Sequence, residues 1–154
     1  MKIDEIDIRI LQELKKNARL SMRELGKKIN LSPPSVAERV RRLEDQGVIE
    51  GYTVSINRKK LGFAIDCLME VSIKNGEYQR FQQYIESHPR MVFCYRITGE
   101  SCYMVKLSVV SLKEIEDFIN EVCTFAKTVS HIVISEVKPQ PDAEWQLPIL
   151  QNEK

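Results

Sequence analysis

The stretch MRELGKKINLSPPSVAERVRRLEDQGVIEGY, residues 22–52, decides the fold of the first part of this chain. Its beginning matches a helix start, because Ser21 and Glu24 stand in the Ser-x-x-Glu capping pattern. Leu25 and Ile29 follow four residues apart, which places both on one face of a helix. The pattern therefore predicts a short helix of about two turns whose apolar side is buried.

The second part of the stretch predicts a further helix after a tight turn. Ser32 is a good N-cap, Pro33 suits the first helical position, and Gly47 supplies a stop signal. Three apolar residues at positions i, i+4 and i+7 form one buried stripe: Val36, Val40 and Leu43. The residues on the other side are expected to face solvent: Pro34, Ser35, Glu38, Arg41 and Arg42, with Arg39 on the flank.

A longer helix is predicted before this stretch, capped by Asp4 and ending near Asn17. Its apolar residues follow the helical period: Ile6, Ile10, Leu11 and Leu14. A helix, a short helix, a tight turn and a helix with an arginine-rich outer face follow the order of a helix-turn-helix unit. The last helix of such a unit enters the major groove of DNA.

The predicted DNA contacts fall into two groups. Free backbone N–H groups at the start of the third helix are expected to hold a phosphate, with added backbone contacts from Arg19, Ser21, Lys27 and Lys28. Base edges are within reach of Ser35, Glu38 and Arg42. The full predicted DNA-binding set is Arg19, Ser21, Lys27, Lys28, Ser32, Pro34, Ser35, Glu38, Arg39, Arg41 and Arg42.

A purely structural interpretation of the arginines stays open. In that interpretation Arg39, Arg41 and Arg42 solubilise an exposed helix and pair at helical spacing with its acidic residues: Glu38, Glu44 and Asp45. Charge distribution favours the DNA interpretation. Residues 1–60 hold 14 Lys and Arg against 9 Asp and Glu, whereas residues 61–154 hold 9 against 13. A basic front half beside an acidic rear half suggests a polyanion partner for the front half.

Composition excludes several classes of protein. Apolar residues make up 43% of the chain and charged residues 29%, which is the balance of a folded, soluble protein. No apolar stretch approaches the ~20 residues of a membrane span, so we expect a cytoplasmic, nucleoid-associated protein without membrane contact. The four cysteines form no Cys-x-x-Cys pair, so we expect reduced, mostly buried thiols and neither a metal site nor a redox motif.

The second half of the chain predicts alternating strands and helices. Strands are expected at residues 63–73, 92–98, 103–109 and 129–137. Helices are expected at residues 77–88 and after Ser111, which with Glu114 repeats the capping pattern. The order βαββαβ describes a ferredoxin-like domain.

Several segments carry a family resemblance: residues 22–52 above all, with 3–14, 60–62, 94–106 and 129–137. They resemble the leucine-responsive regulatory protein / AsnC family, the feast/famine transcription regulators, and look most like its LrpC branch. The resemblance implies an α+β protein with two domains: a winged helix-turn-helix at 1–50 and a ferredoxin-like (RAM-type) α/β sandwich at 63–138. It implies a linker strand within 51–62, near Tyr52 to Ile56, between these domains, and a C-terminal tail at 139–154 after them. It also implies a homodimer that assembles to a tetramer or octamer.

The resemblance implies an amino-acid effector as well, and here the sequence departs from the family. The family's Gly-x-x-Asp motif helps to hold a free amino acid, with the Asp carboxylate answering the ammonium group. The corresponding residues are Gly99, Cys102 and Tyr103, and the Cys102 thiol cannot supply that charge-assisted hydrogen bond. We therefore expect amino-acid sensing to be weakened or absent, while turn geometry and strand packing alone also account for these residues.

Two further alternatives remain. Sirohaem decarboxylases are similar across both domains and rely on pocket histidines, but His88 and His131 form no catalytic constellation, so no enzyme activity, catalytic residue or cofactor is expected. A DNA-wrapping architectural role with little effector dependence is compatible with Cys102. Proline spacing in the tail predicts an irregular segment whose apolar residues pack across a subunit interface or fray.

Overall fold

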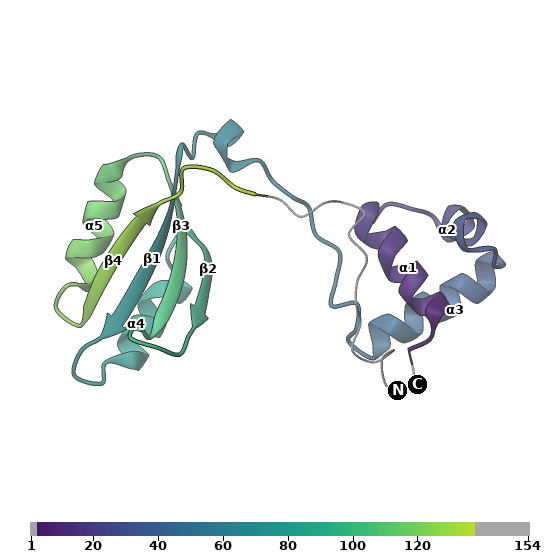
Figure 1. Ribbon diagram of the computed structural model, residues 1–154, viewed down its shortest axis with the longest axis horizontal. Helices are drawn as coiled ribbons and strands as arrows, with labels where there is room; N and C mark the ends of the chain where they lie inside the picture. The colour runs from purple at the N-terminus through teal and green to yellow at the C-terminus, as the bar shows by residue number, and fades with distance from the viewer. Residues whose placement is uncertain (1–2, 138–154) are drawn as a thin grey trace. The chain divides into compact units, whose positions relative to one another are not determined.

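The computed structural model describes residues 3–137, so the predicted tail at 139–154 lies outside the described residues. The chain divides into two compact units, residues up to 55 and residues 56–137 (Figure 1). The first unit is helical and the second contains the only sheet of the described residues.

The first unit contains the three predicted helices, α1 (Glu5–Lys16), α2 (Met22–Ile29) and α3 (Pro33–Asp45). Their predicted N-caps are confirmed. Asp4 and Asp7 form a reciprocal capping box on α1, and Ser21 and Glu24 form the predicted one on α2. These caps satisfy backbone N–H groups that have no partner within the helix.

The helices meet in a small apolar core. Its buried members are the stripes that the sequence predicts, together with the apolar face of α1: Ile10, Leu14, Leu25, Ile29, Val36, Val40 and Leu43. The turn between α2 and α3 is short because Asn30 takes a left-handed conformation, with φ of 59°. A short polar side chain tolerates this conformation better than most residues do.

The linker strand predicted near Tyr52 to Ile56 does not form within the single chain. Residues 51–57 have no regular secondary structure, and a 3-10 helix, η1 (Arg58–Leu61), follows them. A strand needs a neighbour to pair its backbone N–H and C=O groups, and within residues 3–137 no segment of the chain pairs with this one. The Asn57 side chain instead accepts a hydrogen bond from the backbone of Lys60 and caps η1.

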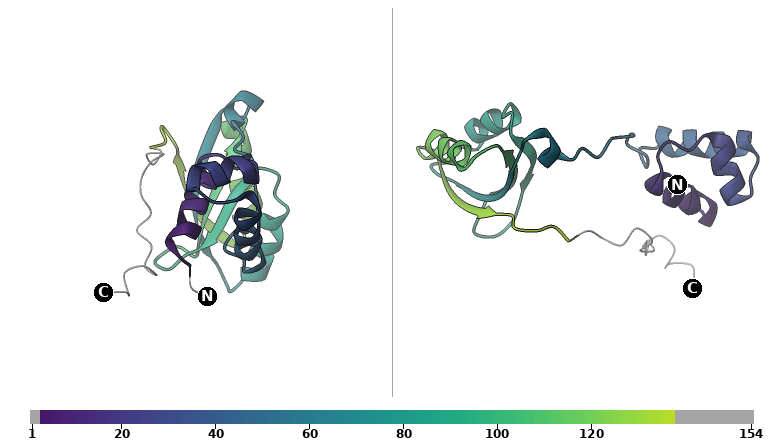
Figure 2. Two further views of the ribbon diagram at one scale, coloured as in Figure 1. Left: turned by 90° about the vertical axis from the view of Figure 1, so that its right-hand side faces the viewer. Right: turned by 90° about the horizontal axis from the view of Figure 1, so that it is seen from above.

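The second unit has the predicted βαββαβ order. Its elements are β1 (Ile65–Ile73), α4 (Tyr78–Glu86), β2 (Met91–Arg96), β3 (Tyr103–Val109), α5 (Leu112–Val122) and β4 (Ala126–Ile132). The strands form one antiparallel sheet in the order β2-β3-β1-β4, which is the ferredoxin-like arrangement. Helices α4 and α5 both lie on one side of the sheet (Figure 2).

Strand alternation separates two faces of this sheet. The helix-covered face holds the core, with Met69 of β1 opposite Val105 of β3. The other face is open, and it carries both apolar and charged side chains: Asp66, Leu68, Glu70, Phe93, Tyr95, Met104, Lys106 and Val129.

The last strand and the cap of the last helix differ most from the prediction in the second unit. The last strand spans Ala126–Ile132 rather than 129–137, because its pairing with β1 ends at Cys67↔Ile132 and β1 itself begins at Ile65. Ser111 makes no capping hydrogen bond. Glu114 is instead held by two hydrogen bonds from the Arg90 guanidinium, of 2.9 and 2.7 Å, and a bidentate ionic pair outweighs a neutral cap.

The cysteine prediction needs one correction. All four thiols are free, but only Cys67 is buried, whereas Cys94 and Cys102 are half-buried and Cys123 is exposed. Cys123 lies at the C-terminal end of α5, beyond the apolar face that packs on the sheet.

Candidate DNA-binding surface

The outer face of α3 forms a shallow groove of about 470 Å³. Its lining comes entirely from α3 and the residue after it: Ser35, Glu38, Arg39, Arg41, Arg42, Asp45 and Gln46. Pro34, Ser35, Glu38, Arg41 and Arg42 are exposed, as the periodicity of the sequence predicts. Val36, Val40 and Leu43 anchor the opposite side of the helix in the core, so the outer face is fixed in orientation.

The start of α3 does not offer the free backbone N–H groups that are general at helix starts and were predicted here. Pro33 and Pro34 have no backbone N–H, and the N–H of Ser35 donates to the Ser32 hydroxyl at 3.3 Å. The N–H of Val36 already donates to the carbonyl of Ser32. What remains at this end is the pair of Ser32 and Ser35 hydroxyls, 2.7 Å apart, together with the helix dipole.

The residues predicted to contact phosphates around α2 are exposed. Arg19 lies in the loop before α2, where its backbone N–H donates to the Asn17 side chain. Lys27 and Lys28 lie in the last turn of α2, and Lys28 pairs with Glu13 of α1 at 2.9 Å. That hydrogen bond from Lys28 lowers the pKa of Glu13.

Ser21 is less available than predicted. Its backbone N–H and its hydroxyl both donate to Glu24, at 2.8 and 2.7 Å, and these hydrogen bonds lower the pKa of the Glu24 carboxyl. The backbone N–H groups of Met22 and Arg23 lie in the first turn of α2, where a helix has no internal acceptors for them. The first turn of α2 therefore keeps two backbone N–H groups of a kind that Pro33 and Pro34 do not supply to α3.

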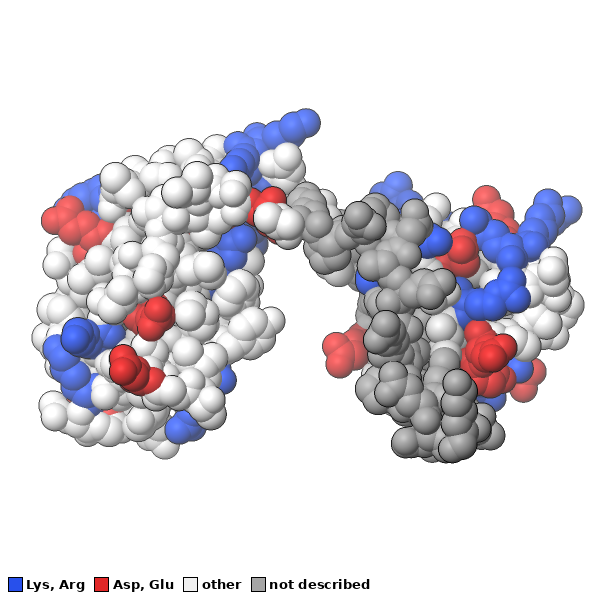
Figure 3. Space-filling model, viewed as in Figure 1, with Lys and Arg blue, Asp and Glu red and all other residues white. Residues whose placement is uncertain are grey.

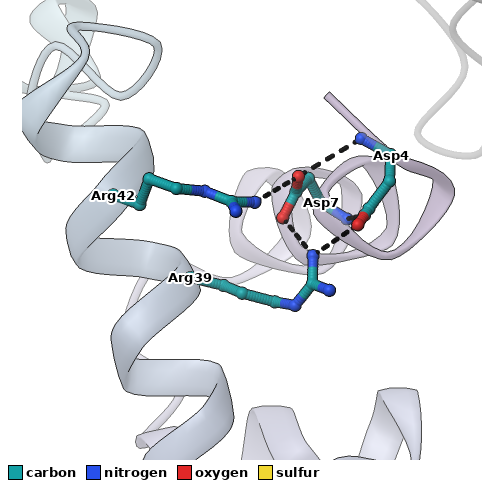
Figure 4. Close-up of polar contacts among 4 residues, drawn as sticks. All are labelled: Asp4, Asp7, Arg39 and Arg42. Atoms are coloured by element: carbon teal, nitrogen blue, oxygen red, sulfur yellow. Dashed lines mark hydrogen bonds and ion pairs between the residues drawn. The ribbon is translucent and has the colours of Figure 1, made fainter. Parts of the chain in front are cut away.

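Asp7 binds two of the predicted DNA-binding arginines (Figure 4). Arg39 donates to one carboxylate oxygen of Asp7 at 2.8 Å, and Arg42 donates to the other at 2.7 Å. The Asp7 side chain is fully buried, while Arg39 and Arg42 remain 25% and 43% exposed. Arg39 also donates to Asp4 at 2.7 Å.

This cluster revises both interpretations of the arginines. Helical pairing within α3 holds only for Arg41, which meets Asp45 at 3.7 Å with both side chains largely exposed. The shared partner of Arg39 and Arg42 is Asp7 of α1, which was not among the predicted site residues. Its position offered a signal, since Asp7 stands three residues before Ile10 and seven before Leu14, on the apolar side of α1.

The pKa of Asp4 reflects the same cluster. Burial acts to raise the pKa of this carboxyl, but the hydrogen bonds from Arg39 and from the backbone of Asp7 outweigh it, so the pKa lies below its ordinary value. The same contacts raise the pKa of Arg39. Asp4 and Arg39 are therefore both charged at neutral pH, and the cluster joins the start of α1 to the middle of α3.

The predicted effector residues gather at the β2–β3 turn but do not form a charged site. Gly99 has φ of 119°, which a side chain disfavours. The Cys102 thiol accepts the backbone N–H of Ile73 at 3.4 Å and lies 3.7 Å from the hydroxyl of Tyr78. Tyr103 is a core residue whose ring packs 5.0 Å from that of Phe81.

A polar cluster on the open sheet face was not predicted. Glu70 accepts hydrogen bonds from Ser101 at 2.9 Å and lies 3.1 Å from the imidazole of His131. These contacts lower the pKa of Glu70, with that of Ser101 acting most strongly. Its members come from three separate segments, so only the strand pairing brings them together.

Residues 3–137 contain no group of three His, Cys, Asp or Glu side chains placed to hold a metal ion. Within the same range no helix has the length and hydropathy that crossing a bilayer requires.

Comparisons with known proteins agree with this architecture. Residues 3–50 match a family described as winged helix-turn-helix DNA-binding, and residues 66–143 match the Lrp/AsnC ligand binding domain. The HTH-type transcriptional regulator LrpC of Bacillus subtilis is 53% identical over 137 residues, which covers 89% of this chain and 95% of LrpC.

Solved structures show the same likeness. The structure of B. subtilis LrpC superposes with a TM-score of 0.87 at 52% identity and covers 91% of this chain and 100% of that one. The regulator NMB0573 of Neisseria meningitidis, solved as a complex with L-Met, has a TM-score of 0.82 at 26% identity, with 89% of this chain and 93% of that chain covered. With its helix-turn-helix and its ligand-binding domain, this chain belongs to the Lrp/AsnC family of DNA-binding transcriptional regulators.

Proposed function

We propose that this regulator reads duplex DNA with the outer face of α3 and holds the phosphate backbone mainly through α2. The groove along α3 carries this proposal, because its lining combines a donor-rich side chain, Arg41, with Ser35 and Glu38 on a rigidly anchored helix. Arg19, Lys27 and Lys28 supply phosphate contacts around α2, next to the first-turn amides of Met22 and Arg23.

The division between base and phosphate contacts is testable with duplexes selected from a random-sequence pool. Arg41→Ala is expected to reduce the preference for selected over unselected duplexes, since a base contact contributes about 1–3 kcal/mol of discrimination. Lys27→Ala is expected to lower the affinity for both duplexes by the same factor. The slope of log affinity against log salt concentration is expected to become shallower by about one released ion. Lys113→Ala on α5 is a control with the same loss of charge in the second unit. The proposal fails if the parent chain ignores selected duplexes at low salt.

We propose further that the chain acts as a homodimer that assembles to a tetramer or octamer. The open face of the sheet supports this, because Phe93 and Tyr95 stack at 4.9 Å there and Tyr95 is 62% exposed. In Figure 3 most of the visible surface of the second unit is uncharged, with a few acidic and basic side chains on it. Tyr52, Val54 and Ile56 alternate in the unpaired linker and are all exposed, which suits pairing with a second copy.

A symmetric dimer predicts two half-sites separated by whole turns of DNA, about 34 Å each. Light scattering of Tyr95→Asp tests the assembly, and a mass equal to that of the parent contradicts a role for this sheet face. Periodic hypersensitive bands in a DNase footprint indicate wrapping, whereas one short protected palindrome argues against an architectural role.

An amino-acid effector is proposed to bind weakly or not at all. The related NMB0573 was solved with L-Met, but Cys102 places a neutral thiol against Tyr78 and Ile73 at the turn where the family carries an Asp. Calorimetry with a panel of amino acids tests this, and micromolar binding of any of them contradicts it.

We propose that the chain is no enzyme and that it resides in the cytoplasm on the nucleoid. The His88 ring packs 5.3 Å from that of Phe118 and 5.5 Å from that of Tyr84, so it is a packing residue. His131 pairs with Glu70 on the sheet surface. A visible absorbance titration with sirohaem tests the decarboxylase alternative, and a shifted spectrum at micromolar concentration supports it.

A further inference from the structure

The buried carboxylate of Asp7 does more in the DNA-binding unit than complete the capping box of α1. It holds Arg39 and Arg42, two of the three arginines on the recognition helix, from a different helix. We propose that Asp7 is a specificity-determining residue: by retaining Arg39 and Arg42 it withholds their charge from DNA phosphates and thereby weakens binding to arbitrary sequence. This inference rests on the proposed use of α3 as the DNA-reading helix.

Both carboxylate oxygens of Asp7 are occupied. One accepts from Arg39 at 2.8 Å, and the other accepts from Arg42 at 2.7 Å and from the backbone N–H of Asp4 at 3.2 Å. These are short, charge-assisted contacts. The side chain of Asp7 is fully buried, so water does not screen the pairs as it screens the exposed pair of Arg41 with Asp45.

A DNA phosphate is a poor competitor for these two arginines. Pulling both of them away leaves the Asp7 carboxylate buried without a cationic partner, which is far more costly than breaking a surface ion pair. Arg41 carries no such restraint, because its side chain is 82% exposed and its partner Asp45 is 68% exposed. The recognition helix therefore presents one exposed arginine in a surface ion pair and two arginines that Asp7 holds.

The contact with Asp7 does not remove Arg42 from the groove along α3. Its side chain keeps 43% exposure while one terminal nitrogen is fixed on Asp7. A guanidinium fixed at one end presents its remaining donors at a defined place. That arrangement suits a contact with one base edge, and it does not suit adaptable contacts with successive phosphates.

The principal test is Asp7→Asn in the full-length chain, measured by fluorescence anisotropy on a selected and an unselected duplex over a range of salt. We expect the affinity for the unselected duplex to rise several-fold. We also expect one to two more ions to be released on binding, each of which steepens the slope of log affinity against log salt concentration by about 0.9. The ratio of selected to unselected affinity is expected to fall. Glu5→Gln is the matched control, because it removes the same charge from an exposed residue of the same helix turn and is expected to leave that ratio unchanged.

If circular dichroism shows that Asp7→Asn is unfolded, Arg42→Ala provides a second test. This variant is expected to lose sequence preference, while the salt dependence of its binding to the unselected duplex stays at the parent value. If Arg42→Ala releases one ion fewer than the parent on binding, Arg42 neutralises a phosphate, and that result overturns the proposal. An unchanged affinity ratio in a folded Asp7→Asn variant overturns it as well. If the parent itself binds no selected duplex, the proposed DNA-reading role fails instead.

Discussion

Gly26 in the middle of α2 lies against the backbone carbonyl of Leu31, so closely that a Cβ on Gly26 would stand 2.6 Å from the Leu31 oxygen. The contact arises because Asn30 turns the chain back with a left-handed conformation, and the N–H of Leu31 then donates to the carbonyl of Gly26. The obstacle is backbone rather than a movable side chain. The turn between the two helices of the DNA-reading motif therefore requires glycine at this position.

Gly26→Ala is expected to destabilise the first unit despite the better helix propensity of alanine. Alanine contributes roughly 1 kcal/mol of propensity, whereas forcing extra atoms into a packed site costs about 1–3 kcal/mol. Urea unfolding followed by circular dichroism measures the difference. Lys27→Ala on the same helix is the control and is expected to change stability little. A Gly26→Ala variant at least as stable as the parent contradicts the close approach.

Ser32→Ala is expected to lower stability by about 1 kcal/mol, the usual loss at a helix N-cap. The Ser32 hydroxyl accepts the N–H of Ser35, and since Pro33 and Pro34 have none, this is the first amide of α3. Ser35→Ala keeps the cap and loses only the contact between the two hydroxyls. Thermal unfolding of the two variants is therefore expected to rank Ser32→Ala as the less stable, and the opposite order contradicts the cap assignment.

Local features of the first unit were predictable because they depend on neighbours in sequence. The cap at Ser21 and the stripe of Val36, Val40 and Leu43 follow from helical spacing alone. The expected phosphate-binding amides of α3 were wrong for a reason visible in the sequence. Helix starts in general have free backbone N–H groups, but Pro33 and Pro34 carry none.

Other features depend on partners that sequence spacing does not specify. Asp7 and Arg42 are 35 residues apart, and only the packing of α1 on α3 brings them to 2.7 Å. The bounds of β4 follow from its pairing with β1, so the alternation of apolar residues up to 137 misplaced them. The linker likewise has strand-like alternation, but residues 3–137 supply no strand beside it.

His88 predicts a pH dependence of stability in the second unit. Burial lowers the pKa of its imidazole, with Arg90 adding to the effect while Glu121 and Glu114 oppose it. The ring accepts the backbone N–H of Arg90 at Nδ1, so the folded state favours the neutral form. On acidification the unfolded chain takes up this proton first, near pH 6.5. The contribution of neutral His88 is thus present above that pH and is lost as pH falls through the folded pKa.

The measurement compares urea midpoints between pH 7 and pH 5 for the parent chain and for His88→Asn, whose amide oxygen still accepts the N–H of Arg90. The variant is expected to lose less stability on acidification. His131→Asn, altered on the exposed sheet face, serves as the control. A proton titration of the His88 ring by NMR with a midpoint above its ordinary value contradicts the prediction.

Cys102→Asp is expected to create or strengthen amino-acid binding. The thiol already lies where a carboxylate can be stabilised, because the N–H of Ile73 points to it at 3.4 Å and the hydroxyl of Tyr78 lies at 3.7 Å. An Asp there adds the negative charge that an ammonium group requires.

A hydrogen bond to a charged group contributes about 1.5–3 kcal/mol, which corresponds to roughly a tenfold to hundredfold gain in affinity. Calorimetry with the same panel of amino acids on parent and variant measures the gain, and Cys94→Ser controls for loss of a thiol elsewhere in the sheet. If the parent and Cys102→Asp bind the same amino acid equally tightly, the thiol at this turn is not what limits sensing, and the β2–β3 turn does not carry the ammonium contact in this protein.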